Sequence, residues 1–309
     1  MKPAYRSLFH LLSFIEKREL EVAREPSSPQ LFITGLPRSG TTLISQYAVH
    51  RFAFAYFTRA AGDHPWAACA VTHWQRFWNT RYVSDFSSRI GKCRGPVAPR
   101  EAGAFWGKYL GYNEYIRPEM ITSASRETVK RTIWRVQNHA NDAPFINKNV
   151  KHLLRLEGML SIFPNAAFII VERDLSEIAI SLLDVRRELS DDLTQWFSIR
   201  PPSYQELVGL DPIEQIARQV VGLHHKMEQD LKRLQAQRIA RLHYREFCRE
   251  PEMLGDIIRS FYPQIVLSNP PQKNFAYHVR TPRNGDERAL DARVQELARD
   301  RKGGTVDSR

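Results

Sequence analysis

The stretch LFITGLPRSGTTL, residues 31–43, decides the fold of this chain. Its first three residues, 31–33, are an apolar run typical of a buried strand, and residues 41–49 resume helical spacing. Gly35 and Gly40 bound the loop between them. A glycine loop from a buried strand into a helix turns backbone N–H groups toward one point, where the helix N-terminus adds partial positive charge. The stretch therefore predicts an anion-binding loop in an α/β fold.

The loop differs from the Walker A loop of ordinary ATPases and GTPases. In a Walker A loop a lysine follows the second glycine and reaches the β- and γ-phosphates, whereas Thr41 stands at that position here. Arg38 is the only cation within the loop, and its guanidinium is suited to bidentate binding of phosphate or sulfate oxygens. The sequence thus disfavours an ATP or GTP motor. A glycine turn without a ligand is the structural alternative.

The rest of the chain extends this unit into a P-loop-containing three-layer α/β fold with a central parallel sheet flanked by helices. Residues 50–145 lack sustained periodicity, so we expect short helices and loops there. Strands that alternate with helical segments predict a parallel sheet with crossover helices. Helices are expected at 4–23, 151–163, 175–189, 213–234 and 286–300, and further strands at 166–172 and 239–244.

The composition is that of a folded globular protein. The chain has 309 residues, of which 42% are hydrophobic and 11% aromatic, enough for a sizeable core. Its N-terminal apolar stretch is broken by His10, Glu16 and Lys17, so it fits neither a signal peptide nor a transmembrane segment, and we expect a cytoplasmic protein. The 3 cysteines are far apart and support neither a disulfide framework nor a zinc-ligand pair.

The charge balance is strongly basic. Lys plus Arg minus Asp plus Glu is 45 − 34 = +11, which favours polyanionic partners such as nucleotides, nucleic acid or acidic glycans. The chain has neither a nucleic-acid recognition motif nor a basic run with interleaved stacking aromatics, so we expect no nucleic-acid partner.

Two motifs together resemble a known family. The run PRSGTT, residues 37–42, resembles the 5′-phosphosulfate loop of the sulfotransferases that use 3′-phosphoadenosine-5′-phosphosulfate (PAPS). The 3′-phosphate site of that family is an arginine at the end of a later strand with a serine eight residues on, as Arg173 and Ser181 are here. An arginine at the carboxyl end of a parallel strand faces the ligand crevice. A solvated surface pair, Arg173 with Asp174, is the alternative.

Two weaker matches accompany them. Tyr244 in YREFCREP resembles a family tyrosine that lies near the nucleotide, although a tyrosine at a strand end is more often a core residue. The segment PREAGAFW, residues 99–106, resembles a bacterial branch of the family.

The resemblance implies one sulfotransferase-like domain over residues 1–309. Within it, 30–50 would be the phosphosulfate loop unit, 60–145 the acceptor-side segment and 151–260 the 3′-phosphate-binding half. PAPS would be the co-substrate, with no metal required, and the acceptor a hydroxyl of a carbohydrate, glycolipid or other small molecule. The implied nucleotide-binding residues are Pro37, Arg38, Ser39, Gly40, Thr41, Thr42, Arg173, Ser181 and Tyr244.

Sulfuryl transfer by in-line displacement also needs charge stabilisation and a base. Arg38 would stabilise the leaving phosphate, and Lys148 lies where the family often keeps a catalytic Lys or His, although a plain surface lysine is equally consistent with its position. We favour Glu101 as the base. Its rivals are Asp63, His64 and His73.

Two further alternatives remain open. The tryptophans between Trp66 and Trp106 are consistent with an acceptor cleft or, more simply, with core packing. A P-loop small-molecule kinase using ATP is the alternative function. Arg173 with Ser181 discriminates against it, because ATP has no 3′-phosphate.

Overall fold

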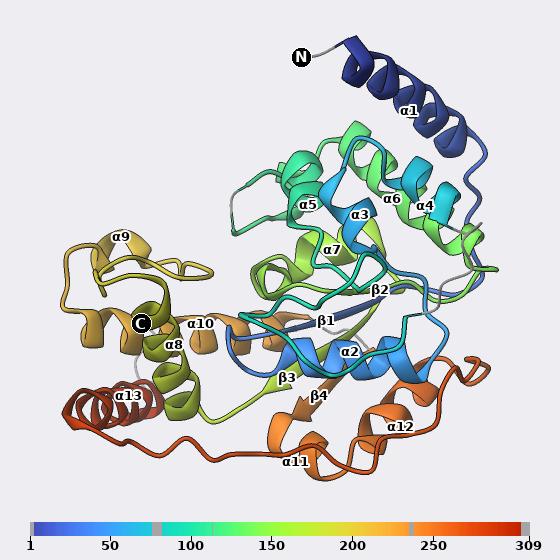
Figure 1. The fold of residues 1–309 in the computed structure, drawn as a ribbon. Helices are drawn as coiled ribbons and strands as arrows, with labels where there is room; N and C mark the ends of the chain where they lie inside the picture. The colour runs from blue at the N-terminus through green and yellow to red at the C-terminus, as the bar shows by residue number, and fades with distance from the viewer. Residues whose placement is uncertain (1–2, 76–81, 113, 235–237, 304–309) are drawn as a thin grey trace.

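A central sheet of parallel strands organises the computed structural model, which describes residues 3–75, 82–112, 114–234 and 238–303 (Figure 1). The strand order is β2-β1-β3-β4, and every neighbouring pair is parallel. Leu31 in β1 pairs with Ile146 of β2 and Ala167 of β3. The predicted parallel α/β fold is confirmed. The strands are β1 (Leu31–Gly35), β2 (Ile146–Lys148), β3 (Ala167–Glu172) and β4 (Ile239–His243).

Helices cover both faces of this sheet (Figure 1). They are α1 (Pro3–Glu21), α2 (Thr41–Arg51), α3 (Arg59–Asp63), α4 (Ala68–Gln75), α5 (Gly103–Leu110), α6 (Ser123–His139), α7 (Leu156–Ile162), α8 (Leu175–Leu189), α9 (Tyr204–Leu207), α10 (Pro212–Arg233), α11 (Tyr244–Arg249), α12 (Glu252–Phe261) and α13 (Gly285–Gly303), with short 3₁₀ helices at Pro118–Met120 and Val150–Leu154. None of the helices, over the residues described, is long and apolar enough to cross a membrane.

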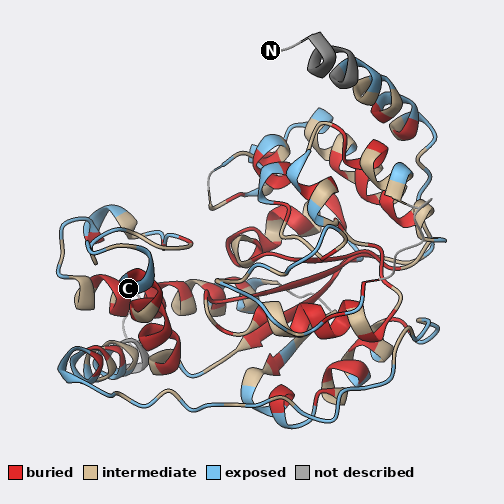
Figure 2. Cartoon of the chain, viewed as in Figure 1, coloured by how far each residue is buried: buried red, intermediate tan, exposed pale blue. Residues whose placement is uncertain are grey.

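The central strand β1 is buried on both faces, which explains its continuous apolar run. Leu31 and Ile33 belong to a core cluster with side chains of α2, α11 and α12. Phe32, between them, belongs to the opposite cluster, with side chains of α6, α7, α8 and α10. Figure 2 shows β1 and β3 as buried, whereas the edge strand β4 is mostly half-buried or exposed. The period of two along the strand therefore separates the core into two layers.

The prediction of one continuous helix at 151–163 is wrong. A 3₁₀ turn, Val150–Leu154, ends at Arg155, whose φ of −134° breaks the helix before α7 begins. The Arg155 side chain is buried, its Nε donates to the carbonyl of Glu114 at 3.2 Å, and burial lowers its pKa to about 10. A tertiary contact thus overrides the helical periodicity of this segment.

Residues 50–145 hold more regular structure than the sequence predicted. The helix α6 extends over 17 residues and begins at Thr122, whose hydroxyl accepts from the N–H of Ser125 at 3.1 Å. The edge strand β2, just after this segment, was not predicted at all. It has only three residues, two of them polar, so it carries no apolar run.

The C-terminal part of the chain returns to the sheet's carboxyl edge. After α12 the chain runs as an extended segment to α13, which packs against α8 and α10 (Figure 1). Leu290 and Val294 of α13 are buried. The extended segment before α13 is therefore held at both of its ends.

Candidate active site at the carboxyl edge of the sheet

A cavity of about 620 Å³ opens where the carboxyl ends of β1, β2 and β3 meet the first turn of α2. This is the edge at which open parallel sheets bind ligands. Every residue predicted for the site lines this cavity except Ser39. The predicted residues that line it are Pro37, Arg38, Gly40, Thr41, Thr42, Glu101, Lys148, Arg173, Ser181 and Tyr244.

The loop conformation depends on its second glycine. Gly40 caps α2 with a φ of 99°, in the left-handed region, and a Cβ atom there would lie 2.2 Å from Cδ2 of Tyr244. Gly40 thus satisfies both a backbone requirement and a close contact. Arg38 also has a positive φ, of 68°. The N–H of Ser39 donates to the carbonyl of Leu36 at 3.1 Å, and Ser39 is fully buried beneath the loop.

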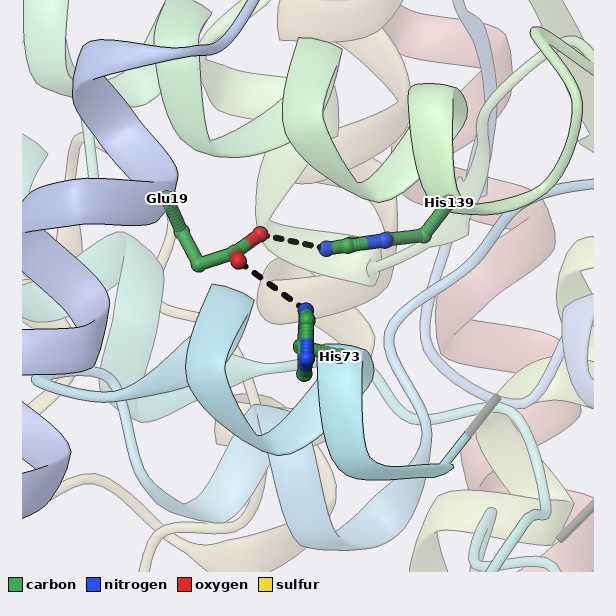
Figure 3. Close-up of side chains that lie close together, drawn as sticks. All are labelled: Glu19, His73 and His139. Atoms are coloured by element: carbon green, nitrogen blue, oxygen red, sulfur yellow. Dashed lines mark hydrogen bonds and ion pairs between the residues drawn. The ribbon is translucent and has the colours of Figure 1, made fainter. Parts of the chain in front are cut away.

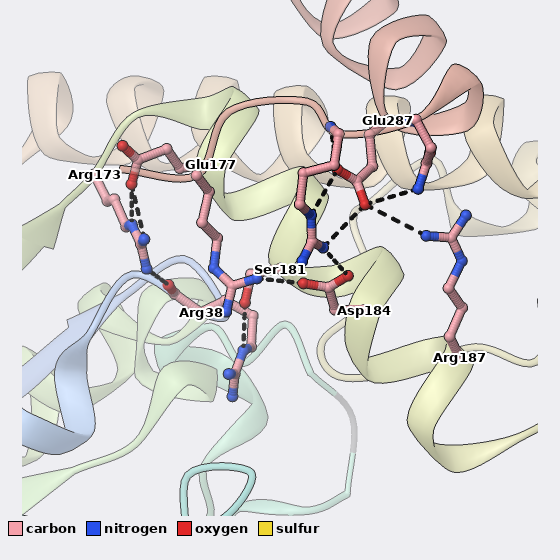
Figure 4. A network of polar contacts seen from close by, with 10 residues as sticks. Arg38, Arg173, Glu177, Ser181, Asp184, Arg187 and Glu287 are labelled. Atoms are coloured by element: carbon pink, nitrogen blue, oxygen red, sulfur yellow. Dashed lines mark hydrogen bonds and ion pairs between the residues drawn. The ribbon is translucent and has the colours of Figure 1, made fainter. Parts of the chain in front are cut away.

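The two predicted phosphate motifs contact each other (Figure 4). Nε of Arg38 donates to Oγ of Ser181 at 3.0 Å, and Nη1 of Arg173 donates to the carbonyl of Arg38 at 3.2 Å. Burial lowers the pKa of Arg38, and the positive charges of Arg280 and Arg173 lower it further. Within the described ranges Arg38 forms no ion pair, so its charge is uncompensated by direct contact.

The side chain of Arg173 is largely buried and is fixed by contacts with its neighbours, so it does not belong to a solvated surface pair. Its Nε and Nη2 each lie 2.8 Å from Oε2 of Glu177, one turn into α8. Its guanidinium lies over the rings of Tyr244 and Tyr277, at 5.2 and 5.9 Å from their centroids. Asp174 instead caps α8, accepting from the N–H of Glu177 at 3.0 Å. The alternative of a solvated pair with Asp174 is therefore wrong.

The segment before α13 supplies a wall of the cavity that the sequence analysis missed. Tyr277, Arg280 and Arg283 line the cavity. The hydroxyl of Tyr277 donates to Glu177 Oε1 at 2.7 Å, and burial and this contact raise its pKa to about 12. Arg280 and Arg283 both pair with Asp184 of α8. The only feature of the sequence that could have indicated this wall is the run YHVRTPR, residues 277–283, which is rich in arginine and begins with two aromatic rings but has no helix or strand pattern.

Lys148 and Glu101 form an ion pair beside the loop. Lys148 ends β2, is only 7% exposed, and its Nζ contacts Glu101 Oε1 and donates to Thr42 Oγ1 at 3.1 Å. The alternative of a surface lysine is wrong. Glu101 is 39% exposed and also lines a second cavity, of about 280 Å³, on the side of residues 90–93 and 99–104. The ion pair therefore lies between two cavities.

Two asparagines, which sequence reasoning missed, position Glu101. Nδ2 of Asn147 donates to the carbonyl of Arg100 at 3.0 Å, and Nδ2 of Asn149 donates to the carbonyl of Glu101 at 3.1 Å. Trp106 is fully buried and its Nε1 donates to Oδ1 of Asn147 at 3.0 Å, so core packing and not an acceptor cleft explains it. Each asparagine flanks Lys148, so one strand end holds both members of the ion pair.

The rival bases lie in different surroundings. Asp63 lines the second cavity and pairs with Arg100 at 3.2 Å. His64 bonds through Nδ1 to the carbonyl of Ala60 at 2.8 Å, and His73 pairs with Glu19 at 2.9 Å. Among the described lining residues of the two cavities, neither histidine occurs. Only Asp63 thus remains a geometric rival of Glu101.

Comparison with known proteins identifies the family of this fold and site. Residues 29–259 match the family model described as the sulfotransferase family. Two curated relatives, from Mycobacterium bovis and Mycobacterium tuberculosis, are both named omega-hydroxy-beta-dihydromenaquinone-9 sulfotransferase Stf3. Each is 23% identical over 266 residues, which cover 79% of this chain and 64% of the relative. The chain thus spans 64% of the length of the curated relatives it matches.

Solved structures share the fold. The sulfotransferase STF9 from Mycobacterium avium is 18% identical, with a TM-score of 0.54 over 97% of this chain and 74% of that chain. The sulfotransferase STF1 from Mycobacterium tuberculosis is 14% identical, with a TM-score of 0.52 over 93% of this chain and 81% of that one. These likenesses concern the fold, whereas the family model matches the sequence across well over half of the chain. This chain belongs to the sulfotransferase family.

Proposed function

We propose that this protein transfers the sulfuryl group of PAPS to a hydroxyl of an acceptor molecule. The observation that carries the proposal is the meeting of two anion-binding motifs in one cavity, since Arg38 of the loop touches Ser181 and Arg173. A donor with a 5′-phosphosulfate and a 3′-phosphate has an anion for each motif, whereas ATP has none for the second. A cavity of about 620 Å³ is in the range of ordinary ligand sites.

On the donor side, the chain's own groups bind and orient the nucleotide. Residues 37–42, from Pro37 to Thr42, would hold the 5′-phosphosulfate through loop N–H groups and hydroxyls at the start of α2. Arg173 and Ser181 would hold the 3′-phosphate, and the ring of Tyr244 would lie beside the nucleotide. Arg38, which forms no ion pair within the part of the chain that the structure describes and lies near the positive charges of Arg280 and Arg173, would stabilise the charge that develops on the departing 5′-phosphate.

On the acceptor side, we propose that the hydroxyl reaches the ion pair from the second cavity. The Glu101 carboxylate would take the hydroxyl proton as the acceptor oxygen bonds to sulfur and the bond from sulfur to the 5′-phosphate oxygen breaks. Lys148, between Glu101 and Thr42, would stabilise charge on the transferring group. No metal enters this step. The second product is 3′-phosphoadenosine-5′-phosphate.

The acceptor class and the domain organisation belong to the same proposal. The acceptor would be a hydroxyl of a carbohydrate, glycolipid or other small molecule, and the curated relatives, named for a hydroxylated menaquinone derivative, support a lipid among these. We propose one domain over residues 1–309, with 60–145 on the acceptor side because Glu101 and residues 90–93 line the second cavity. Residues 30–50 and 151–260 would form the donor site.

A thermal-shift comparison tests the donor. Wild type and Arg173→Ala are heated with 3′-phosphoadenosine-5′-phosphate, ADP or ATP, without added metal. A ligand at a hundred times its dissociation constant stabilises by about 2.7 kcal/mol, which is a shift of several degrees. We expect a shift of that size with the bisphosphate alone, and its loss in Arg173→Ala.

A neighbouring arginine supplies the control. Arg187, on the same helix α8, pairs with Asp286 at 2.6 Å and lies outside the described lining of the cavity. Arg187→Ala should keep the bisphosphate shift. Equal shifts with all three nucleotides, or a larger shift with ATP, would overturn the sulfotransferase proposal in favour of a kinase.

A further inference from the structure

Three side chains that commonly ligate metals converge from three helices, away from the cavity (Figure 3). Glu19 lies on α1, His73 on α4 and His139 on α6. Oε1 of Glu19 lies 2.9 Å from Nδ1 of His73, and its Oε2 lies 2.6 Å from Nε2 of His139. One ligand atom from each of the three residues lies within 4.8 Å of the others. Two imidazoles thus face one carboxylate.

The burial of this cluster demands compensation for its charge. The side chains of Glu19 and His139 are 9% and 2% exposed, and a buried carboxylate needs a cation or several donors beside it. Arg135 supplies part of this, since its Nε donates to Oε2 of Glu19 at 2.5 Å. Oε1 faces His73, which is 27% exposed. The cluster is therefore held from the α6 side and open to solvent at His73.

The donor set fits a borderline transition-metal cation better than Mg²⁺ or Ca²⁺. Imidazole nitrogen suits Zn²⁺, whereas magnesium and calcium prefer oxygen ligands. Two histidines and one glutamate form a known zinc-ligand set, which leaves the fourth position of a tetrahedron for water. The carboxylate and the two nitrogens are now at hydrogen-bond distances of 2.6 to 2.9 Å. Ligand atoms around a tetrahedral Zn²⁺ ion are about 3.3 Å apart, so each imidazole would have to move away from the carboxylate by about 0.4 to 0.7 Å to admit the ion.

We propose that Glu19, His73 and His139 bind one Zn²⁺ ion, which connects α1 to α4 and α6. The other described contacts of α1 are consistent with such a role. Oε2 of Glu16 accepts from the N–H of Ala70 in α4 at 2.8 Å, and the carbonyl of Leu20 accepts from Arg131 of α6 at 3.1 Å. The ion would add a further connection at the same junction. This site is separate from sulfuryl transfer and does not rest on the proposed function.

Metal titration of the full chain tests this site without an activity assay. Metal-free wild type is titrated with Co²⁺, whose visible absorption reports tetrahedral nitrogen and oxygen ligation, and the Co²⁺ is then displaced by Zn²⁺ against a chromophoric chelator. We expect one equivalent per chain. The variant His73→Ala should lose more than about 100-fold in Zn²⁺ affinity, beyond the 10- to 100-fold cost of losing an outer hydrogen-bond partner.

Controls separate ligation from folding. His10→Ala changes an exposed histidine of the same helix and should leave stoichiometry and affinity unchanged. Because His139 is buried, His73→Ala and His73→Gln are the main variants, and circular dichroism confirms that each is folded. The proposal is overturned if wild type binds no stoichiometric Co²⁺ or Zn²⁺, or if folded His73→Ala binds either ion as tightly as wild type does.

Discussion

Two arginines that contact helix α8 lie in contrasting surroundings: Arg186, in the last turn of α8, and Arg38 of the loop, which touches Ser181 in the middle of that helix. Arg186 donates to the carbonyl of Leu193 and to Gln215 Oε1, both at 2.9 Å, and burial lowers its pKa to about 10. Arg38, in contrast, donates to Ser181 and lies beside the cavity, near the positive charges of Arg280 and Arg173. Both Nη atoms of Arg186 donate to neutral acceptors of the core, so this residue serves the fold. Arg38 keeps donors for a ligand, so buried charge alone does not mark a site.

The ion pair between Lys148 and Glu101 at the cavity's edge differs from Arg38, because its charges are already paired. Glu101→Gln keeps the shape of the side chain and its place beside Lys148 but removes the carboxylate base. We expect turnover to fall by about 10² to 10⁴, with nucleotide binding unchanged. Steady-state sulfuryl transfer and calorimetric binding of the bisphosphate measure the two effects. As a control, Glu127→Gln changes an exposed glutamate that pairs with Arg131 on α6 and should have wild-type turnover. Wild-type turnover in Glu101→Gln would eliminate Glu101 as the base.

Arg38→Ala tests the unpaired arginine directly. We expect the rate of transfer to fall by about 10² to 10³, because a donor to developing charge is lost, and bisphosphate binding to weaken. The free energy of unfolding should not decrease, since removing Arg38 relieves repulsion with Arg173 and Arg280. Transfer assays and urea unfolding give the two readouts. A clear loss of stability with wild-type affinity would reverse the assignment of the two arginines.

Arg186→Met should show the opposite pattern. It leaves the carbonyl of Leu193 and two glutamine side chains without their donor, at a cost of about 1 to 3 kcal/mol for each buried acceptor left unpaired. We expect Tm to fall by several degrees while the dissociation constant of the bisphosphate, measured on folded protein, stays within about twofold. A large loss of affinity in Arg186→Met would show that the core contacts of Arg186 are coupled to the cavity.

The smallest expected effect concerns a carboxylate that connects α10 to α13. Hydrogen bonds from Arg293, and then Arg218, lower the pKa of Glu214 to about 2. A lowered pKa means that this contribution is present above the ordinary pKa of a glutamate and is lost as pH falls through about 2. We expect Glu214→Gln to be less stable by up to about 1 kcal/mol at pH 7 and equal to wild type near pH 2. Urea unfolding across pH measures this, and a constant difference would contradict it.

The fold and the donor side of the site were readable because they depend on local sequence. The run at residues 31–43 contains strand, glycine loop and helix in direct succession, and Arg173 follows an apolar strand. Parallel strands bring their carboxyl ends to one edge, so residues far apart in the chain were expected together. The contact from Arg38 to Ser181 agrees with that expectation.

The features of the fold and of the site that the sequence analysis missed depend on tertiary contacts, which leave no local pattern in the sequence. The strand β2 is three residues long, and the asparagines on either side of Lys148 act through single hydrogen bonds to backbone carbonyls. Tyr277 and Arg280 lie on a segment without helix or strand, so no periodicity places them at the cavity. Arg155 breaks a helix through a contact 41 residues away. Such features follow from the assembled structure and not from spacing.

The position of the segment before α13 also has a consequence for biosynthesis. A ribosome makes the loop at residues 37–42 early and the wall with Tyr277 and Arg280 near the end of the chain. The sheet's strands are complete once β4 has emerged, but Tyr277 and Arg280 can contact Glu177 and Asp184 of α8 only after the segment before α13 has been made. A nascent chain therefore contains all strands of the sheet before it contains this wall, and a stop codon just before Tyr277 would leave the cavity open on one side.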